Sequence, residues 1–173
     1  MKRLMELAGF LAAHGMWSFD EDGALTPFAG YEMPDGARGL VRFVDASLEA
    51  GVANARYYIE NNLQHAAMAV MVFDGSYMAD GSPVQALLVE GRKYRVADGD
   101  APGALAVAIP YRPATESTPL DILFPELLQF ETDGESFDLL EAFFGGLDSH
   151  GPAAEFWEQH ARFERQVPVA NAG

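Results

Sequence analysis

The sequence contains no cysteine, and this absence removes several kinds of chemistry at once. Disulfide bridges, thiolate metal sites and cysteine nucleophiles are all excluded. Long apolar runs are also missing, since none approaches the roughly 18 residues that a membrane-spanning helix needs. The opening segment MKRLMELAGFLAAHG looks like a secretory signal, but Glu6 interrupts it, so we expect an amphipathic helix there and a cytoplasmic location.

Motifs of common active sites are absent as well. The chain has no G-x-S-x-G, G-x-G-x-x-G or G-x-x-x-x-G-K-[ST] motif, which mark hydrolase, dinucleotide and P-loop sites. None of the four histidines stands in an H-x-H or H-E-x-x-H pattern that would indicate a metal. The sequence therefore predicts no metal and no cofactor, and it favours a non-catalytic function.

Positive charge is scarce, with 11 Lys and Arg against 26 Asp and Glu and a net charge of −15. Such a chain repels phosphate backbones and anionic membranes, so we expect neither nucleic acid nor a membrane as a partner. The negative charge fits a basic protein partner. In that case the chain would be an acidic inhibitor or an immunity-type protein.

The residues that are present are enough for a folded domain. Hydrophobic residues make up 49% of the chain and aromatic residues 12%, and 173 residues can bury roughly 70% of the unfolded surface. We predict a single domain over residues 1–166 and a frayed tail over 167–173.

Local patterns predict the elements of the first half. The first helix should end near His14 with Gly15 as a left-handed C-cap. The turn Pro34-Asp35-Gly36 indicates a hairpin with strands near 26–33 and 38–44, although the spacing after Leu40 also permits a helix to begin there. A helix over 46–62 should follow, with Asp45 as its cap and Leu48, Val52, Ala55 and Ile59 as its buried side.

The second half predicts a sheet and then helices. Strands near 68–78 and 83–92 flank the turn Asp80-Gly81, and a third strand covers 104–111. Residues 121–131 are a further strand that Pro125 restricts to a sheet edge or a bulge. Helices near 135–147, ended by Gly145-Gly146 or Gly151, and 152–165 follow. The smaller turns are expected at 21–23, 98–100 and 132–135.

Adjacent strands without intervening helices define the fold class. We predict an α+β fold, a predominantly antiparallel twisted β-sheet packed with helices in the order α-ββ-α-βββ-(β)-αα.

The turn Asp80-Gly81 also predicts the register of its hairpin. Residue 79 should pair with 82, so that Asp74 faces residue 87 and Glu90 faces residue 71. Asp74 and Glu90 with the nearby Lys93 are the residue types found at the Mg²⁺ site of some nucleases. This register, however, puts the two acids on opposite faces of the sheet, where they cannot share a metal. Both faces of the hairpin are apolar, so each needs a cover, from helices or from a second subunit in a homodimer.

Few residues stand out as functional candidates. His65 with Glu60 and Glu90 could serve a hydrolase or transferase that uses acidic residues with a histidine or metal. Tyr111, Arg112 and Tyr58 are candidates for ligand binding, because tyrosine combines an apolar body with a polar tip and arginine binds anions. Arg112 could equally pair with an acid of the chain. The favoured function is a protein-interaction or small-ligand-binding domain.

Overall fold

A computed structural model describes residues 1–19, 24–96, 101–131 and 138–163 of the chain. The turns predicted at 21–23, 98–100 and 132–135 and the predicted tail over 167–173 lie outside the described residues. The elements are α1 (Lys2–Trp17), β1 (Phe28–Glu32), β2 (Arg38–Arg42), α2 (Leu48–Glu60), β3 (Met68–Ala79), β4 (Ser82–Lys93), β5 (Gly103–Arg112), β6 (Asp121–Ile122), β7 (Glu126–Glu131), α3 (Leu139–Asp148) and α4 (Pro152–His160).

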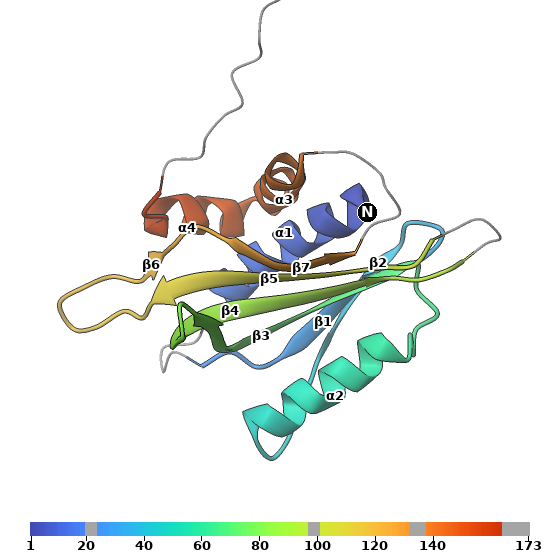
Figure 1. The fold of residues 1–173 in the computed structure, drawn as a ribbon, viewed down its shortest axis with the longest axis horizontal. Coiled ribbons are helices and arrows are strands. Elements are labelled where there is room, and N and C mark those ends of the chain that lie inside the picture. The colour runs from blue at the N-terminus through green and yellow to red at the C-terminus, as the bar shows by residue number, and fades with distance from the viewer. Residues whose placement is uncertain (20–23, 97–100, 132–137, 164–173) are drawn as a thin grey trace, which may run out of the picture.

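The fold has three layers, with α1, α3 and α4 on one face of a sheet and α2 on the other (Figure 1). In the described residues the sheet has seven strands in the order β2-β1-β3-β4-β5-β6, and β7 pairs with β5 beside this path. The pairings between these strands are antiparallel, which confirms the predicted α+β class and element order. No helix in the described part of the chain is long and apolar enough to cross a membrane.

The hairpin of β3 and β4 has the predicted register. Asp80 and Gly81 both have positive φ, 49° and 79°, which is the conformation that a two-residue turn between twisted strands requires. Ala79 pairs with Ser82, and the ladder then puts Asp74 opposite Leu87. Glu90 consequently points to the other face of the sheet, and the two acids do not share a site.

Each face of the sheet has its own core, as the two apolar faces of the hairpin require. On one face, Val72, Leu87 and Ile109 are fully buried under α1 and the C-terminal helices. On the other face, Met71 and Phe73 pack with Ala55 and Ile59 of α2. The chain therefore covers the second face over β1 and β3 with its own helix.

Helix α1 continues past the predicted end at Gly15 and stops at Ser18. Gly15 does not adopt a left-handed conformation and is not a C-cap, so that prediction was wrong. A Cβ atom at this position would lie 2.9 Å from Val72 Cγ1 and 3.1 Å from Leu87 Cδ2. The glycine lets the helix approach the sheet closely instead of ending the helix.

Helices α1 and α3 also touch through glycines. A Cβ atom on Gly146 would lie 1.8 Å from the carbonyl oxygen of Glu6, and one on Gly9 would lie 1.9 Å from that of Phe143. The expectation that Gly145-Gly146 ends the helix was wrong, because α3 continues to Asp148. The glycine is required for the contact between the two backbones.

Helix α2 begins later than predicted. Its N-cap is Ser47, whose side chain accepts a hydrogen bond from the backbone N–H of Ala50, whereas Asp45 accepts one from the Asn54 side chain. Leu48 is 48% exposed and is not part of the buried side. The alternative of a helix from Leu40 was wrong, because Leu40 lies in β2.

The segment 121–131 divides into β6 and β7, with Pro125 between them. β7 lies at the edge of the sheet and carries a bulge, as the proline predicted. The final helix is shorter than the predicted 152–165, because Ala161 has an extended backbone. The predicted start at residue 135 lies outside the described residues, and α3 begins after its N-cap Asp138.

Candidate functional site

An apolar groove lies between β7 and α3, and we call it the β7–α3 groove. It has a volume of about 290 Å³. α1 and β5 form its floor, while α3 and the segment from Phe124 to Leu127 form its walls. The lining residues are Met5, Val107, Phe124, Pro125, Leu127, Leu139, Leu140 and Phe143.

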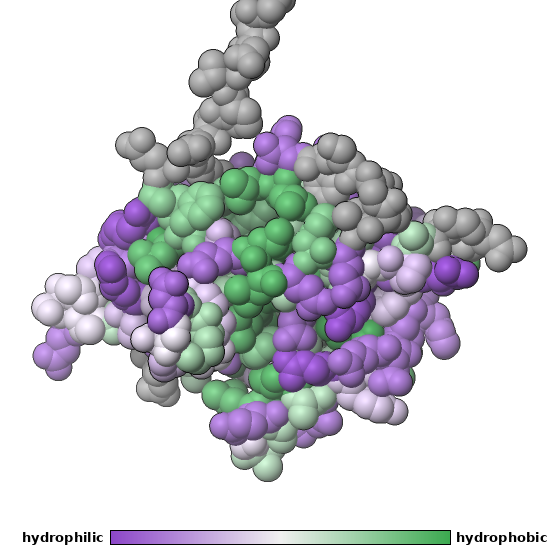
Figure 2. Space-filling model, in the orientation of Figure 1, coloured by the Kyte–Doolittle hydropathy of each residue, from purple (hydrophilic) through white to green (hydrophobic). Residues whose placement is uncertain are grey.

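Large apolar side chains of this groove are open to solvent. Leu127 is 47% exposed, Leu140 44% and Phe124 40%. Figure 2 shows hydrophobic surface running from the α3 layer down across the sheet toward α2, with hydrophilic side chains on both sides. A continuous apolar surface with a polar border is typical of an interaction site.

The bulge in β7 explains why neighbouring leucines are both exposed. Val107 of β5 pairs with Leu127, but Ala106 pairs with Gln129, so Leu128 is the extra residue. Leu128 is 46% exposed. Within the described residues β7 pairs only with β5, so the second edge of the strand is open to another chain.

The segments that build the groove are acidic. Residues 121–131 and 138–148, which build β6, β7 and α3, contain no Lys or Arg. Their acids are Asp121, Glu126, Glu131, Asp138, Glu141 and Asp148. Asp121 is neutralised by Arg162 at 2.6 Å and by Arg112 at 3.8 Å, at the β6 end. The apolar side chains of the groove therefore belong to segments that carry acids and no Lys or Arg.

The predicted catalytic candidates are not joined into one site by any contact in the described part of the chain. Glu90 on β4 accepts two hydrogen bonds from Arg56 of α2, at 2.6 and 3.2 Å. Glu60 lies one turn further along α2, and its negative charge helps to raise the pKa of Arg56. His65 is exposed in the loop after α2, with a φ of 53°, and no hydrogen bond or ion pair connects its side chain to either carboxylate.

The predicted ligand-binding residues lie in different layers. Tyr111 is buried in the core under α1, where its hydroxyl donates to Asp74 Oδ1 and accepts from Gln85 Nε2, both at 2.7 Å. Burial, with help from Asp74, raises the pKa of Tyr111 far above its ordinary value. Tyr58 is buried in the other core, against Phe43, and burial raises its pKa too.

Arg112, the last residue of β5, is exposed and pairs with Asp121, which is the internal pairing that the sequence left open. Tyr111 and Arg112 are neighbours in sequence, but one is buried and the other faces solvent. The structure therefore does not bring Tyr111, Arg112 and Tyr58 to one surface.

A histidine pair is the polar cluster that sequence analysis missed. His14 Nδ1 lies 3.0 Å from His150 Nε2, and the rings of Phe10 and Trp17 pack against His150. The two histidines are 136 positions apart, so no motif could connect them.

Hydrogen bonding assigns the protons of this pair. Arg42 can only donate, so His14 Nε2, at 3.4 Å from its Nη2, accepts, and His14 Nδ1 carries a proton toward His150. Burial of His14, with the charges of His150 and Arg42, lowers its pKa. The Nδ1 atom of His150 is buried and has no hydrogen-bond partner in the described part of the chain.

In that same part of the chain, no group of three or more His, Asp or Glu side chains is placed to hold a metal ion. A comparison of the chain with protein-family models, with curated proteins and with solved structures found no match. The candidate function rests on the geometry of the chain alone.

Proposed function

We propose that this protein is a non-catalytic interaction domain that binds an extended, basic segment of another protein at the β7–α3 groove. The observation that carries the proposal is the combination of three exposed apolar side chains, Phe124, Leu127 and Leu140, with an acidic border and an open strand edge. A homodimer and a small ligand are the other occupants that the sequence suggested.

The open edge of β7 favours an extended segment. A strand that pairs with this edge gains backbone hydrogen bonds, and every second side chain points toward the groove. Pockets beside the edge then select these side chains. Leu127 and Leu140 lie on β7 and α3, the two walls between which such side chains insert.

The acidic border selects for a basic partner. Glu126 and Glu141 are exposed on the two segments that form the walls of the groove, and a Lys or Arg on each side of the apolar residues of a partner would face these carboxylates. Charge of this kind raises the association rate and rejects acidic segments. It also agrees with the net charge of −15, which makes a basic protein the natural partner.

The test uses two fluorescently labelled peptides with the same central stretch of alternating valine and threonine. One carries lysines at both ends and the other carries glutamates. We expect saturable binding of the lysine peptide by fluorescence anisotropy and no binding of the glutamate peptide.

Substitutions then locate the binding site. The double variant Leu127→Ser, Leu140→Ser removes two exposed anchors and should weaken binding of the lysine peptide by roughly tenfold or more. Leu63→Ser is the matched control, because Leu63 is 50% exposed but lies after α2. It should bind the peptide as the unchanged protein does.

Two outcomes would contradict the proposal. One is equal binding of both peptides, or of the lysine peptide by the double variant. The other is a protein that sediments as a dimer and becomes a monomer in the double variant, because the groove would then belong to a second copy of the chain.

A further inference from the structure

A second pocket lies where α1 begins, beside the end of β4, and we call it the Lys93 pocket. It has a volume of about 440 Å³, within the range of small-molecule sites. The residues that line it are Met1, Lys2, Arg3, Leu4, Pro34, Ala67, Met68, Lys93, Tyr94 and Val96.

The lining of this pocket is unusual for so acidic a chain. Among the described residues that form it are the cations Lys2, Arg3 and Lys93, and there is no Asp or Glu. In the whole chain, acidic residues outnumber Lys and Arg by 26 to 11. The fold has therefore gathered positive charge at this place, from α1 and β4, which are far apart in sequence.

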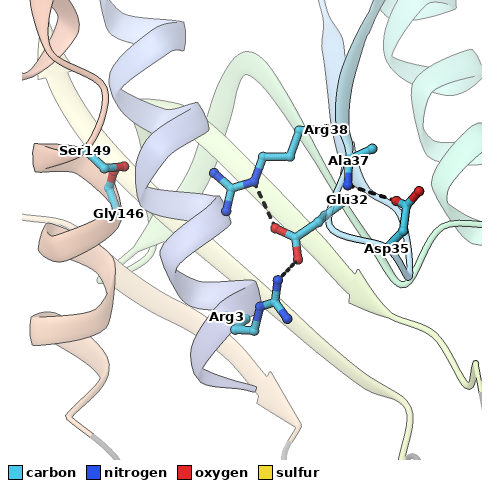
Figure 3. A network of polar contacts seen from close by, with 7 residues as sticks. All are labelled: Arg3, Glu32, Asp35, Ala37, Arg38, Gly146 and Ser149. Atoms are coloured by element: carbon cyan, nitrogen blue, oxygen red, sulfur yellow. Dashed lines mark hydrogen bonds and ion pairs between the residues drawn. The ribbon is translucent and has the colours of Figure 1, made fainter.

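One cation of the pocket, Arg3, pairs with a buried carboxylate. Glu32 is 2% exposed and stands beside Met68 in the ladder, and Met68 in turn pairs with Lys93. Figure 3 shows Arg3 and Arg38 reaching the two oxygens of Glu32 from different sides. A single buried carboxylate thus faces two guanidinium groups, one of them from Arg3 of the pocket.

Lys2 also has an acidic neighbour, since Glu6 lies 4.0 Å from it on the next turn of α1. The side chains of Arg3 and Lys2 stay 68% and 57% exposed, so both can turn toward a bound group.

The walls of the pocket are apolar. Met1, Leu4 and Met68 are buried and belong to the core under α1, and Val96 is 46% exposed at the mouth. An apolar body can therefore lie against the methionines while its charged end meets the lysines and the arginine.

We propose that the Lys93 pocket binds a small organic anion, namely a carboxylate or phosphate group on an aliphatic body. Guanidinium and ammonium groups form charge-assisted hydrogen bonds with both kinds of anion. The aliphatic body leaves water on contact with Met1, Leu4 and Met68. This site is separate from the β7–α3 groove.

The test uses octanoate and octyl phosphate as probes, with octanol and inorganic phosphate as controls. The protein carries ¹³C-methyl methionine, because Met1 and Met68 line the pocket while Met71, on the opposite face of β3, does not. We expect both anionic probes to shift the methyl signals of Met1 and Met68 and to leave Met71 in place.

Variants connect binding to the cations. Lys93→Met should weaken octyl phosphate binding by roughly tenfold, the loss of one charge-assisted contact. Lys2→Met, at an exposed position, provides a second variant should the first one fold poorly. Arg112→Met is the matched control, since Arg112 is also an exposed cation but lies beside Asp121 at the β6 end.

The proposal is overturned if octanol shifts the same methyl signals to the same extent, or if inorganic phosphate binds as tightly as octyl phosphate. It is also overturned if Lys93→Met and Lys2→Met both bind octyl phosphate as the unchanged protein does. Binding that survives in Leu127→Ser, Leu140→Ser supports a site separate from the groove.

Discussion

The β7–α3 groove and the Lys93 pocket both include residues from the beginning of α1, but the segments that form the groove carry acids while the lining of the pocket carries cations. Met5 lines the groove, while the preceding residue Leu4 lines the pocket. Both sites have apolar walls, but six acids and no Lys or Arg occupy the segments around the groove, whereas three cations and no acid line the pocket in the described residues. The net charge of the chain therefore says little about the partner of a particular surface, because the fold distributes acidic and basic side chains unevenly over the molecule.

The substitution Gly146→Ala is expected to have the largest effect, and it should act on the groove. The added methyl group would collide with the backbone of α1 at Glu6 and push α3 away, at a cost of about 3 kcal/mol in the free energy of unfolding. Leu139, Leu140 and Phe143 of α3 would move with it, so the groove should lose the lysine peptide.

Chemical denaturation measures the stability of this variant, and peptide anisotropy measures the groove. Gly145→Ala is the matched control, because a Cβ atom there meets nothing within 4 Å. A Gly146→Ala protein of unchanged stability would show that α1 and α3 do not pack in this way.

A smaller effect, on the pocket side, is expected for Glu32→Gln. The substitution removes the carboxylate that Arg3 and Arg38 share and should lower the free energy of unfolding by about 1–2 kcal/mol. Because both guanidinium groups are about half exposed or more, water compensates part of the loss.

The same variant should sharpen the difference in charge between the two sites. Without Glu32 the Lys93 pocket is more positive, so octyl phosphate should bind several-fold more tightly in a titration, while the lysine peptide binds the groove as before. Weaker binding of octyl phosphate to Glu32→Gln would show that Glu32 positions Arg3 for the ligand.

The smallest expected effect is the pH dependence of the helical layer on the groove side. Because the folded state lowers the pKa of His14, the unfolded chain binds the proton more readily below about pH 6.5. Stability should therefore fall as the pH drops below this value and level off below the lower pKa of the folded state.

Urea denaturation at several pH values between about 7.5 and 5 measures this slope. His14→Gln should reduce it, since glutamine does not titrate. His65→Asn is the control, because His65 is exposed and asparagine tolerates its positive φ. An equal slope in His14→Gln would assign the pH dependence to other groups.

The sheet was predictable where local chemistry is decisive. Asp80 and Gly81 accept positive φ, and this alone determines the register that separates Asp74 from Glu90. Pro125 lacks an N–H and therefore divides β6 from β7. These features depend on neighbouring residues only.

Helix ends were less predictable because a glycine can either end a helix or allow close packing inside one. Gly15 was expected to end a helix, and Gly145-Gly146 was one of two expected ends of another, but Gly15 and Gly146 both lie inside helices at contacts with other elements. A glycine that ends a helix and one that allows close packing look alike in a sequence. Only the neighbour across the contact distinguishes them.

The candidate sites were the least predictable part. Of the residues that were considered for catalysis, Glu60 and Glu90 both interact with Arg56, but no hydrogen bond or ion pair in the described residues connects His65 to either acid. The groove and the pocket each combine residues from several elements, and most of these residues are ordinary leucines, methionines and lysines. No local pattern marks such residues.

By itself, the sequence determined the α+β class, the hairpin of β3 and β4, the apolar character of both faces of that hairpin and the acidity of the chain. Alternation of side chains, turn chemistry and composition are local properties, so they can be read along the chain. Tertiary structure alone decided that α2 covers the second face, that His14 meets His150, and that cations gather beside Lys93. Each of these depends on which distant segments pack together, because a side chain acquires its partner only when the core is formed.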